Sequence, residues 1–180
     1  MAETYKSTGT TAGERFLAQL CRTSFLSLWS LSNPHTDDGK DFSKPTSVGK
    51  ELCDQLVVFG RHVIILSDKD CQYTNHPDPV VNWARYYRTA IWKSAGQLWQ
   101  AEKWLRHFRD RLYQDATCEQ PLQVILPPVA EMIVHRILVV HGVQEYCRKA
   151  LGGDGSFALD TRLVGEAHTK AAEKVVRPFV

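Results

Sequence analysis

Polar residues that could take part in catalysis or bind a metal ion lie within and just after two short apolar segments of the chain. Residues 51–59 read ELCDQLVVF, with Asp54 inside the run, and residues 62–66 read HVIIL and are followed by Ser-Asp-Lys at 67–69. Only two residues separate the segments, which predicts an antiparallel β-hairpin. Charged side chains at the end of aliphatic strands are expensive to bury without a partner. They therefore either reach solvent or converge on a site.

The alternation of side chains along a strand decides which of these residues can meet. We expect Ser67 and Lys69 on one face of the sheet and Asp68 on the other, unless a bulge intervenes. A carboxylate such as that of Asp54 binds a hard divalent cation such as Mg²⁺ through oxygen. The ion lowers the pKa of a bound water and neutralises charge on a phosphate, and a nearby lysine stabilises the charge that develops there. The hairpin is thus a candidate site for phosphate chemistry.

Helices and a further strand are expected to position this hairpin. Apolar residues recur at helical spacing after Glu14, and again from 81 to 113. Residues 133–141 (IVHRILVVH) predict a strand, and residues 156–164 predict a further short strand or hairpin arm. The stretch 33–48 has the composition of a loop. The pattern indicates an α/β fold, in which a small mixed sheet with an antiparallel hairpin is flanked by helices.

The predicted long helix carries an excess of positive charge. Between residues 82 and 113 there are seven basic residues and two acids, which favours contact with phosphate. The aromatic residues interleaved with them are Tyr86, Trp92, Trp99 and Phe108. Because aromatic rings stack on bases, we take Arg85, Arg88 and Lys93 as candidate nucleic-acid contacts. The competing interpretation is a core helix whose tryptophans pack inside and whose basic side chains lie in solvent.

Composition excludes several classes of protein. The chain has 180 residues, 43% hydrophobic and 23% charged, with a net charge of +2, which is typical of one globular domain, with or without a tail. It has no apolar run long enough to cross a membrane, and its N-terminus lacks the apolar segment of a signal peptide. The five cysteines include no CxxC pair and the seven histidines no HxxxH or HxE pair, which argues against a zinc ribbon, a disulfide scaffold or a zinc hydrolase. We expect a cytoplasmic protein with no membrane contact.

The order helix, hairpin, helix, strand, together with the hairpin residues, resembles the PD-(D/E)XK superfamily of restriction-endonuclease-like and RecB-like nucleases. In that pattern Asp54 looks like the first acid and Lys69 like the lysine. Glu14 matches the acid that the first helix often contributes. Gln97, within SAGQLWQAEKWL, resembles the glutamine that RecB-like members place after the third motif. The resemblance covers roughly residues 14–141 and implies a restriction-endonuclease-like core.

The sequence departs from this pattern at the second acid. That acid should stand two residues before the lysine, where this chain has Ser67, which brings no negative charge. Three interpretations stay open: a bulge re-aims Asp68, Glu51 or Glu14 supplies the missing carboxylate, or the site is inactive. The metal ligands that we expect are therefore Asp54 with Glu51 or Asp68.

Longer strings, among them FLSLWSLSNPH and GKELCDQLVVFGRHVIILSDK, are similar to an uncharacterised family of bacterial proteins associated with mobile elements and phage defence. Members tend to be longer, which implies a chain that continues past Val180. We expect a flexible lead at 1–13, a nuclease-like domain at 14–150, and a C-terminal extension at 151–180 that begins a further segment.

The sequence thus predicts a Mg²⁺- or Mn²⁺-dependent nuclease that acts on nucleic acid, DNA by resemblance, in antiphage defence. As partners we expect the nucleic acid and, in a homo- or hetero-oligomer, another defence subunit. A degenerate nuclease fold that binds nucleic acid or a partner protein without cutting is the alternative, and Ser67 favours it. A third interpretation is an α/β interaction protein, in which Asp54 bonds to the backbone and residues 67–70 form an exposed turn.

Overall fold

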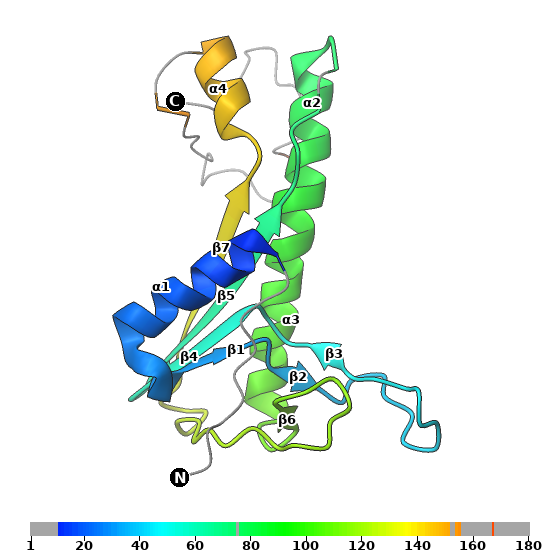
Figure 1. Cartoon of the computed structure of the whole chain (residues 1–180), viewed down its shortest axis with the longest axis vertical. Coiled ribbons are helices and arrows are strands. Elements are labelled where there is room, and N and C mark those ends of the chain that lie inside the picture. Colours follow the sequence, from blue (N-terminus) through cyan, green and yellow to red (C-terminus); the bar gives the residue numbers. More distant parts are fainter. Residues whose placement is uncertain (1–10, 75, 152–153, 156–166, 168–180) are drawn as a thin grey trace. The chain divides into compact units, whose positions relative to one another are not determined.

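The structure is a computed structural model of the chain, shown in Figure 1, and it describes residues 11–74, 76–151, 154–155 and 167. The strand predicted at 156–164 lies outside the described residues, as do residues 1–10 of the predicted lead and most of the predicted extension. Within the described part of the chain, no helix is long and apolar enough to cross a membrane.

The chain divides into two compact units, and we describe each by itself. The first unit contains residues 1–68 and 96–139, and the second contains residues 69–95 and 140–180. The division falls within three elements of the chain. It lies between residues 68 and 69 in one strand, between residues 95 and 96 in a helix, and between residues 139 and 140 in a second strand.

Helix α1 (Ala12–Trp29) begins where the sequence predicts. The Thr11 hydroxyl accepts a hydrogen bond from the Glu14 backbone N–H at 3.1 Å, and the Glu14 carboxylate accepts one from the Thr11 N–H at 3.4 Å. This reciprocal pair is a capping box, which satisfies two backbone donors that the first turn would otherwise leave free.

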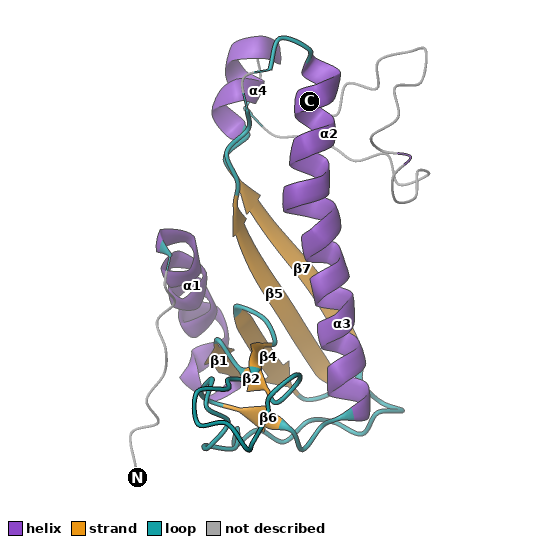
Figure 2. Cartoon of the chain, turned by 90° about the vertical axis from the view of Figure 1, so that its right-hand side faces the viewer, coloured by secondary structure: helices purple, strands orange, loops and turns teal. Residues whose placement is uncertain are grey.

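A four-stranded sheet forms the centre of the first unit. Its strands, in order across the sheet, are β1 (Ser30–Ser32), β4 (Gln55–Phe59), β5 (His62–Asp70) and β7 (Ile133–His141). The pairs β1–β4 and β4–β5 are antiparallel, whereas β5 and β7 run side by side in the same direction (Figure 2). The sheet is therefore mixed, and the helices between β5 and β7 supply the crossover that a parallel pair requires.

The predicted hairpin is confirmed, although its first arm is shorter than 51–59. Phe59 pairs with His62 around the two-residue turn, and Gly60 has the positive φ (57°) that such turns require. The first arm begins only at Gln55. The residues before it do not continue the strand, because the Leu52 N–H donates to the carbonyl of Pro34, 2.8 Å away, and so follows a second sheet.

This second, three-stranded sheet consists of β2 (His35–Thr36), β3 (Lys50–Glu51) and β6 (Leu112–Tyr113), in the order β3-β2-β6. Both pairs are antiparallel. The stretch 33–48, predicted as a loop, is therefore a loop that contains one short strand.

Three consecutive helical segments replace the single helix predicted at 81–113. They are α2 (Pro79–Tyr86), the π-helical turn η1 (Tyr87–Trp92) and α3 (Lys93–His107). The predicted end of the helix at residue 113 is wrong. The chain turns after His107 because the Arg111 guanidinium pairs with both carboxylate oxygens of buried Asp37, each 2.9 Å away, and packs over the ring of Phe108.

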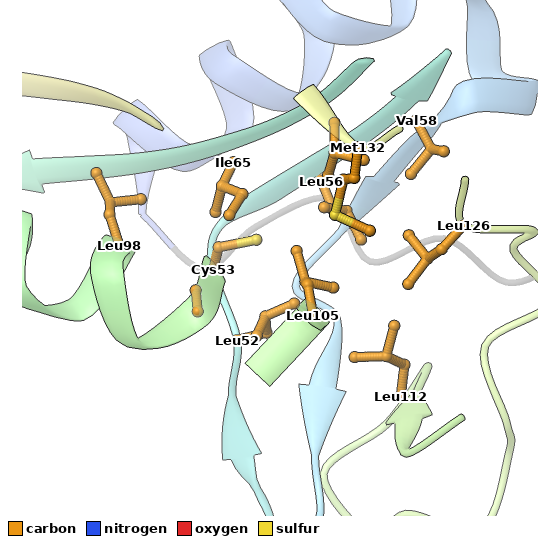
Figure 3. Close-up of a cluster of buried hydrophobic side chains, with 12 residues drawn as sticks. Leu52, Cys53, Leu56, Val58, Ile65, Leu98, Leu105, Leu112, Leu126 and Met132 are labelled. Carbon is orange, nitrogen blue, oxygen red and sulfur yellow. The ribbon is translucent and has the colours of Figure 1, made fainter. Parts of the chain in front are cut away.

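Helices cover both faces of the four-stranded sheet (Figure 2). On one face, Leu17 and Cys21 of α1 pack against Val57 and Leu66. The other face packs against α3 in a larger cluster, part of which Figure 3 shows: Leu52, Cys53, Leu56, Val58, Val63, Ile65, Leu98, Ala101, Leu105, Leu112, Leu126 and Met132. The first unit thus has three layers around a two-sided core.

The second unit has its own core, built from α2, η1 and α4 (Gln144–Leu151). The ring of Tyr73 packs between those of Tyr86 and Tyr146, with centroids 5.4 and 4.4 Å away. The Tyr86 hydroxyl donates to the carbonyl oxygen of His141 at 2.9 Å. Burial is the main reason why the pKa values of Tyr73 and Tyr86 lie well above the ordinary range, so both phenols stay protonated.

The core of the first unit leads to a stability prediction. Leu105 is fully buried between α3 and the sheet, so Leu105→Ala should lower the free energy of unfolding by about 2–5 kcal/mol, measured by urea denaturation. Ile125 is 93% exposed, and Ile125→Ala should change it by less than about 0.5 kcal/mol. Equal effects of the two substitutions would contradict the placement of α3 on the sheet.

Candidate functional site

Asp54 lies just before β4, where the chain passes from the small sheet to the large one. Its backbone oxygen accepts a hydrogen bond from the Asn33 N–H at 3.0 Å. Its carboxylate Oδ2 accepts one from the backbone N–H of Asp68 at 2.6 Å, and the Ser67 side chain lies near enough to lower the pKa of the same carboxyl. Because Gln55 pairs with Leu66, the register of the hairpin places Asp54 at the level of Ser67. The structure thus brings together the acid of the first arm and the polar end of the second.

The faces of the sheet separate Ser67 from Asp68. Val63 and Ile65, which share the parity of Ser67 along β5, pack on the α3 side, whereas Leu66 packs on the α1 side. Asp68 follows the α1 side. A Cβ atom built on Gly13, in the first turn of α1, would lie only 2.1 Å from Asp68 Oδ2. The Asp68 carboxylate therefore rests against the N-terminus of α1, where the helix dipole favours negative charge.

Two more carboxylates lie close enough to act on Asp54 electrostatically. Glu14 stands in the first turn of α1 and also closes its capping box. Glu51 ends β3 and accepts a hydrogen bond from the Asn33 side-chain amide. We call Glu14, Glu51, Asp54 and Asp68 the acidic cluster.

The pKa of Asp54 is raised above its ordinary value. Burial is the largest cause, and the charges of Glu14 and Asp68 act in the same direction, against the hydrogen bonds from Asp68 N–H and Ser67. The pKa of Glu51 is also raised, first by loss of water around its carboxyl and then by the charges of Asp54 and Glu14, while the bond from Asn33 opposes the shift. Negative charge in the acidic cluster is thus held at an energetic cost that a cation would relieve.

In the part of the chain that the structure describes, no group of three or more His, Cys, Asp or Glu side chains is arranged to hold a metal ion. The carboxylates of the acidic cluster instead accept protein hydrogen bonds or lie against backbone. The β4–β5 pairing runs without a bulge from the pair Gln55–Leu66 to the pair Phe59–His62.

Two further residues of the predicted site, Gln97 and Lys69, are not part of the acidic cluster. Gln97 is exposed on α3, on the layer opposite to α1. Lys69 follows Asp68 in β5 and is the first residue of the second unit. Their roles beside Asp54 stay predictions.

Two residues that shape the acidic cluster, Asn33 and Gly13, are not among the site residues predicted from the sequence. Asn33 has a positive φ of 48° and contacts both Glu51 and the backbone of Asp54. An Asn-Pro pair at a turn is the signal that could have identified it. Gly13 leaves the space that the Asp68 carboxylate fills, and nothing in the sequence distinguishes it from any other glycine near a helix start.

The candidate basic residues lie in the second unit. Arg85, Arg88 and Lys93 are exposed, and Trp92 between them is 48% exposed. Tyr86, one of the aromatic residues interleaved with the basic ones in the sequence, is buried in the core of the unit. We call Arg85, Arg88, Trp92 and Lys93 the basic face.

No family model matches the chain, and neither the curated proteins nor the solved structures contain one that is significantly similar to it.

The raised pKa of Asp54 has a consequence for stability. A carboxyl whose pKa is higher in the folded protein than in the unfolded chain favours folding at acid pH, and this contribution is lost as the pH rises through the folded-state pKa. In metal-free buffer at about pH 7.5, Asp54→Asn should therefore raise the Tm, because asparagine still accepts the bond from Asp68 N–H. The gain should shrink as the pH is lowered toward about 4, where Asp54 itself is protonated.

Asp38→Asn is the matched control. Asp38 is exposed and paired with Lys50 at 2.7 Å, so its neutralisation should not raise the Tm. A Tm of Asp54→Asn that equals or falls below that of the wild type throughout this pH range would show that the acidic cluster carries no electrostatic cost.

Proposed function

We propose that the chain is a metal-dependent nuclease that hydrolyses phosphodiester bonds in nucleic acid, with Asp54 as the central metal ligand. The observation that carries the proposal is the position of Asp54. Its carboxylate is fixed against residues 67 and 68 at the end of the hairpin, and burial and neighbouring carboxylates raise its pKa. Such a carboxylate gains most from a bound cation.

The order of the elements supports the same proposal. Along the chain, α1 is followed by the antiparallel β4–β5 hairpin, then by the helical segments and then by β7, with the short strands β1, β2, β3 and β6 in between. Helix, hairpin, helix and strand in this order are what the resemblance to PD-(D/E)XK nucleases implies. The expected roles of Asp54 and Lys69 depend on this correspondence.

The acidic cluster offers carboxylate oxygens, which are the type of ligand that a hard cation prefers. Mg²⁺ binds oxygen, and it is usually held by one or two carboxylates together with water and substrate phosphate. Asp54 would be one ligand, with Glu51 or Asp68 as the second. When bound, the ion would supply an activated water and neutralise charge on the phosphate; Mn²⁺ has the same oxygen preference.

The protein's own residues have separable tasks in this proposal. The Asp68 N–H, with the Ser67 side chain beside it, holds the Asp54 carboxylate in one orientation. Lys69 would stabilise the negative charge that develops on the phosphate. Gln97, exposed on α3, would donate to a phosphate oxygen or position the water. DNA as the substrate, a role in antiphage defence and an oligomer with another defence subunit rest on the resemblance alone.

A specific observation favours a second candidate function. Where the nuclease pattern has a second acid, this chain has Ser67, which lies beside Asp54 and lowers its pKa but adds no negative charge for a metal. On this alternative the chain is a catalytically degenerate nuclease fold that binds nucleic acid or a partner protein. The basic face would then provide the nucleic-acid contacts.

Cleavage assays separate these two functions. We expect Mg²⁺-dependent cleavage of labelled DNA or RNA by the purified protein, no cleavage by Asp54→Asn, and a rate on the order of 10²-fold lower for Lys69→Ala. Asp38→Asn, outside the acidic cluster, should cleave like the wild type. Cleavage that survives Asp54→Asn would remove the proposed ligand.

Ser67→Asp tests the degenerate alternative directly. If the wild type does not cleave, this substitution restores the missing carboxylate, and Mg²⁺ should then raise the Tm of the variant but not that of the wild type. A wild type that cleaves, and that Ser67→Asp does not improve, would rule out the degenerate subunit.

The basic face gives a prediction for binding. Charge reversal at Arg85, Arg88 and Lys93 should weaken nucleic-acid binding, measured by fluorescence anisotropy. The slope of log K against log salt should fall by roughly 0.7–0.9 for each lost phosphate contact. Lys149→Glu, on α4 where Lys149 pairs with Glu145, is the control. Unchanged affinity of the triple variant at low salt would show that the basic face is only a solvated surface.

A further inference from the structure

Two histidines far apart in the sequence meet on the large sheet. His62 begins β5 and His135 lies in β7, the neighbouring strand. Nδ1 of His62 lies 2.9 Å from Nε2 of His135. The two rings are close to parallel, with an interplanar angle of 24° and centroids 5.2 Å apart. Both residues are exposed, and both belong to the first unit.

The pair lines an open groove of about 550 Å³ on the α1 side of the sheet. The other walls are largely apolar and come from α1 and from the strands: Phe25, Phe59, Ile64 and Ile137. Phe59 is itself held by the ring of Trp29, which meets it edge-on at 5.1 Å between centroids. Arg136 also lines the groove, and its guanidinium pairs with the Glu102 carboxylate at 3.4 Å. The two histidines and Arg136 are thus the polar residues of a mostly apolar surface, which is the usual composition of a ligand site.

We propose that His62 and His135 form a binding site for a divalent transition-metal ion of the Zn²⁺ type, held by His62 Nδ1 and His135 Nε2. This site is separate from the acidic cluster and does not depend on the proposed nuclease function. Imidazole nitrogen suits Zn²⁺, Cu²⁺ and Ni²⁺, whereas Mg²⁺ prefers carboxylate oxygen and water. The two sites should therefore select different ions.

The geometry is close to what such an ion requires. Zn–N bonds of about 2.0–2.1 Å at tetrahedral angles place two ligand nitrogens about 3.3–3.4 Å apart. The observed nitrogens, 2.9 Å apart, need to separate by about 0.4–0.5 Å. Because the ring centroids are 5.2 Å apart, the facing nitrogens point at each other, so each exposed ring must also turn to aim its lone pair at a shared ion. Since neighbouring strands fix the two backbones, the ion does not have to order the chain.

The proton between the two rings has a defined destination. When both rings are neutral, one of the two facing nitrogens carries a proton and donates a hydrogen bond to the other nitrogen. Either histidine can be the donor, depending on its tautomer. When the ion binds, the donor ring becomes the other tautomer, with its proton on the outward nitrogen, and both facing lone pairs go to the metal. No net proton is released from the neutral pair, but protonated imidazole competes with the ion, so acid weakens binding.

Two protein ligands leave coordination positions open. In the described part of the chain no third His, Cys, Asp or Glu completes a metal group, so water or an added ligand would fill those positions at this site. An open coordination sphere is typical of exchangeable or catalytic metal sites, whereas structural zinc is enclosed by protein ligands.

Calorimetric titration of the full chain with Zn²⁺ tests the proposal. We expect one Zn²⁺ site per chain. His62→Ala and His135→Ala should each lower the affinity for Zn²⁺ at least tenfold, and the double variant should bind at most a few-fold more weakly than the weaker single variant. His107→Ala, at an exposed histidine of α3 whose Nδ1 faces the Lys103 carbonyl, should bind Zn²⁺ like the wild type.

Circular dichroism of the variants separates a lost ligand from a lost fold, and His62→Gln and His135→Gln give a second, more conservative pair of substitutions. Zn²⁺ binding that both single alanine variants retain would overturn the proposal. So would binding that Asp54→Asn abolishes while His62→Ala leaves it intact, because the ion would then lie in the acidic cluster.

Discussion

The register of the β4–β5 hairpin is the constraint on which the first unit depends. A two-residue turn that contains Gly60 pairs Phe59 with His62 and leaves no freedom to shift the strands. A shift by one residue would take the fully buried Val57 and Val63 out of the packing that they make with α1 and with α3, respectively. The same register carries Asp54 to the level of Ser67 and fixes which polar residues share a face.

Burial on both faces explains why Asp54 stands before β4 and why the charged residues of β5 follow its aliphatic run. The strands are covered by α1 on one face and α3 on the other, so charge along their length would be desolvated. At the hairpin end, Asp54 remains half-buried and its negative charge is opposed by its neighbours. A carboxylate in this position reduces the stability of the metal-free protein, and natural proteins keep such a cost mainly where function requires it.

Local patterns in the sequence predicted most of the fold for identifiable reasons. The apolar residues at helical spacing after Glu14 lie in α1, and the short aliphatic runs form β4, β5 and β7. Where the prediction was wrong, a distant partner decided the outcome. The helix ends at His107 because Arg111 pairs with Asp37, 74 residues away, and Lys50–Glu51 joins a separate sheet through pairing with β2. Propensity carries no information about such partners.

The sequence by itself determined the first helix, the hairpin, the helical region after it and the strand at 133–141, and it singled out Asp54, because periodicity and turn chemistry are local. Only the tertiary structure added the short strands β1, β2, β3 and β6 and decided which side chains meet. It placed Asp68 against Gly13, set Ser67 beside Asp54, and brought His62 beside His135. These contacts join residues on different elements, and their distances follow from strand order and helix packing, which a linear spacing does not encode.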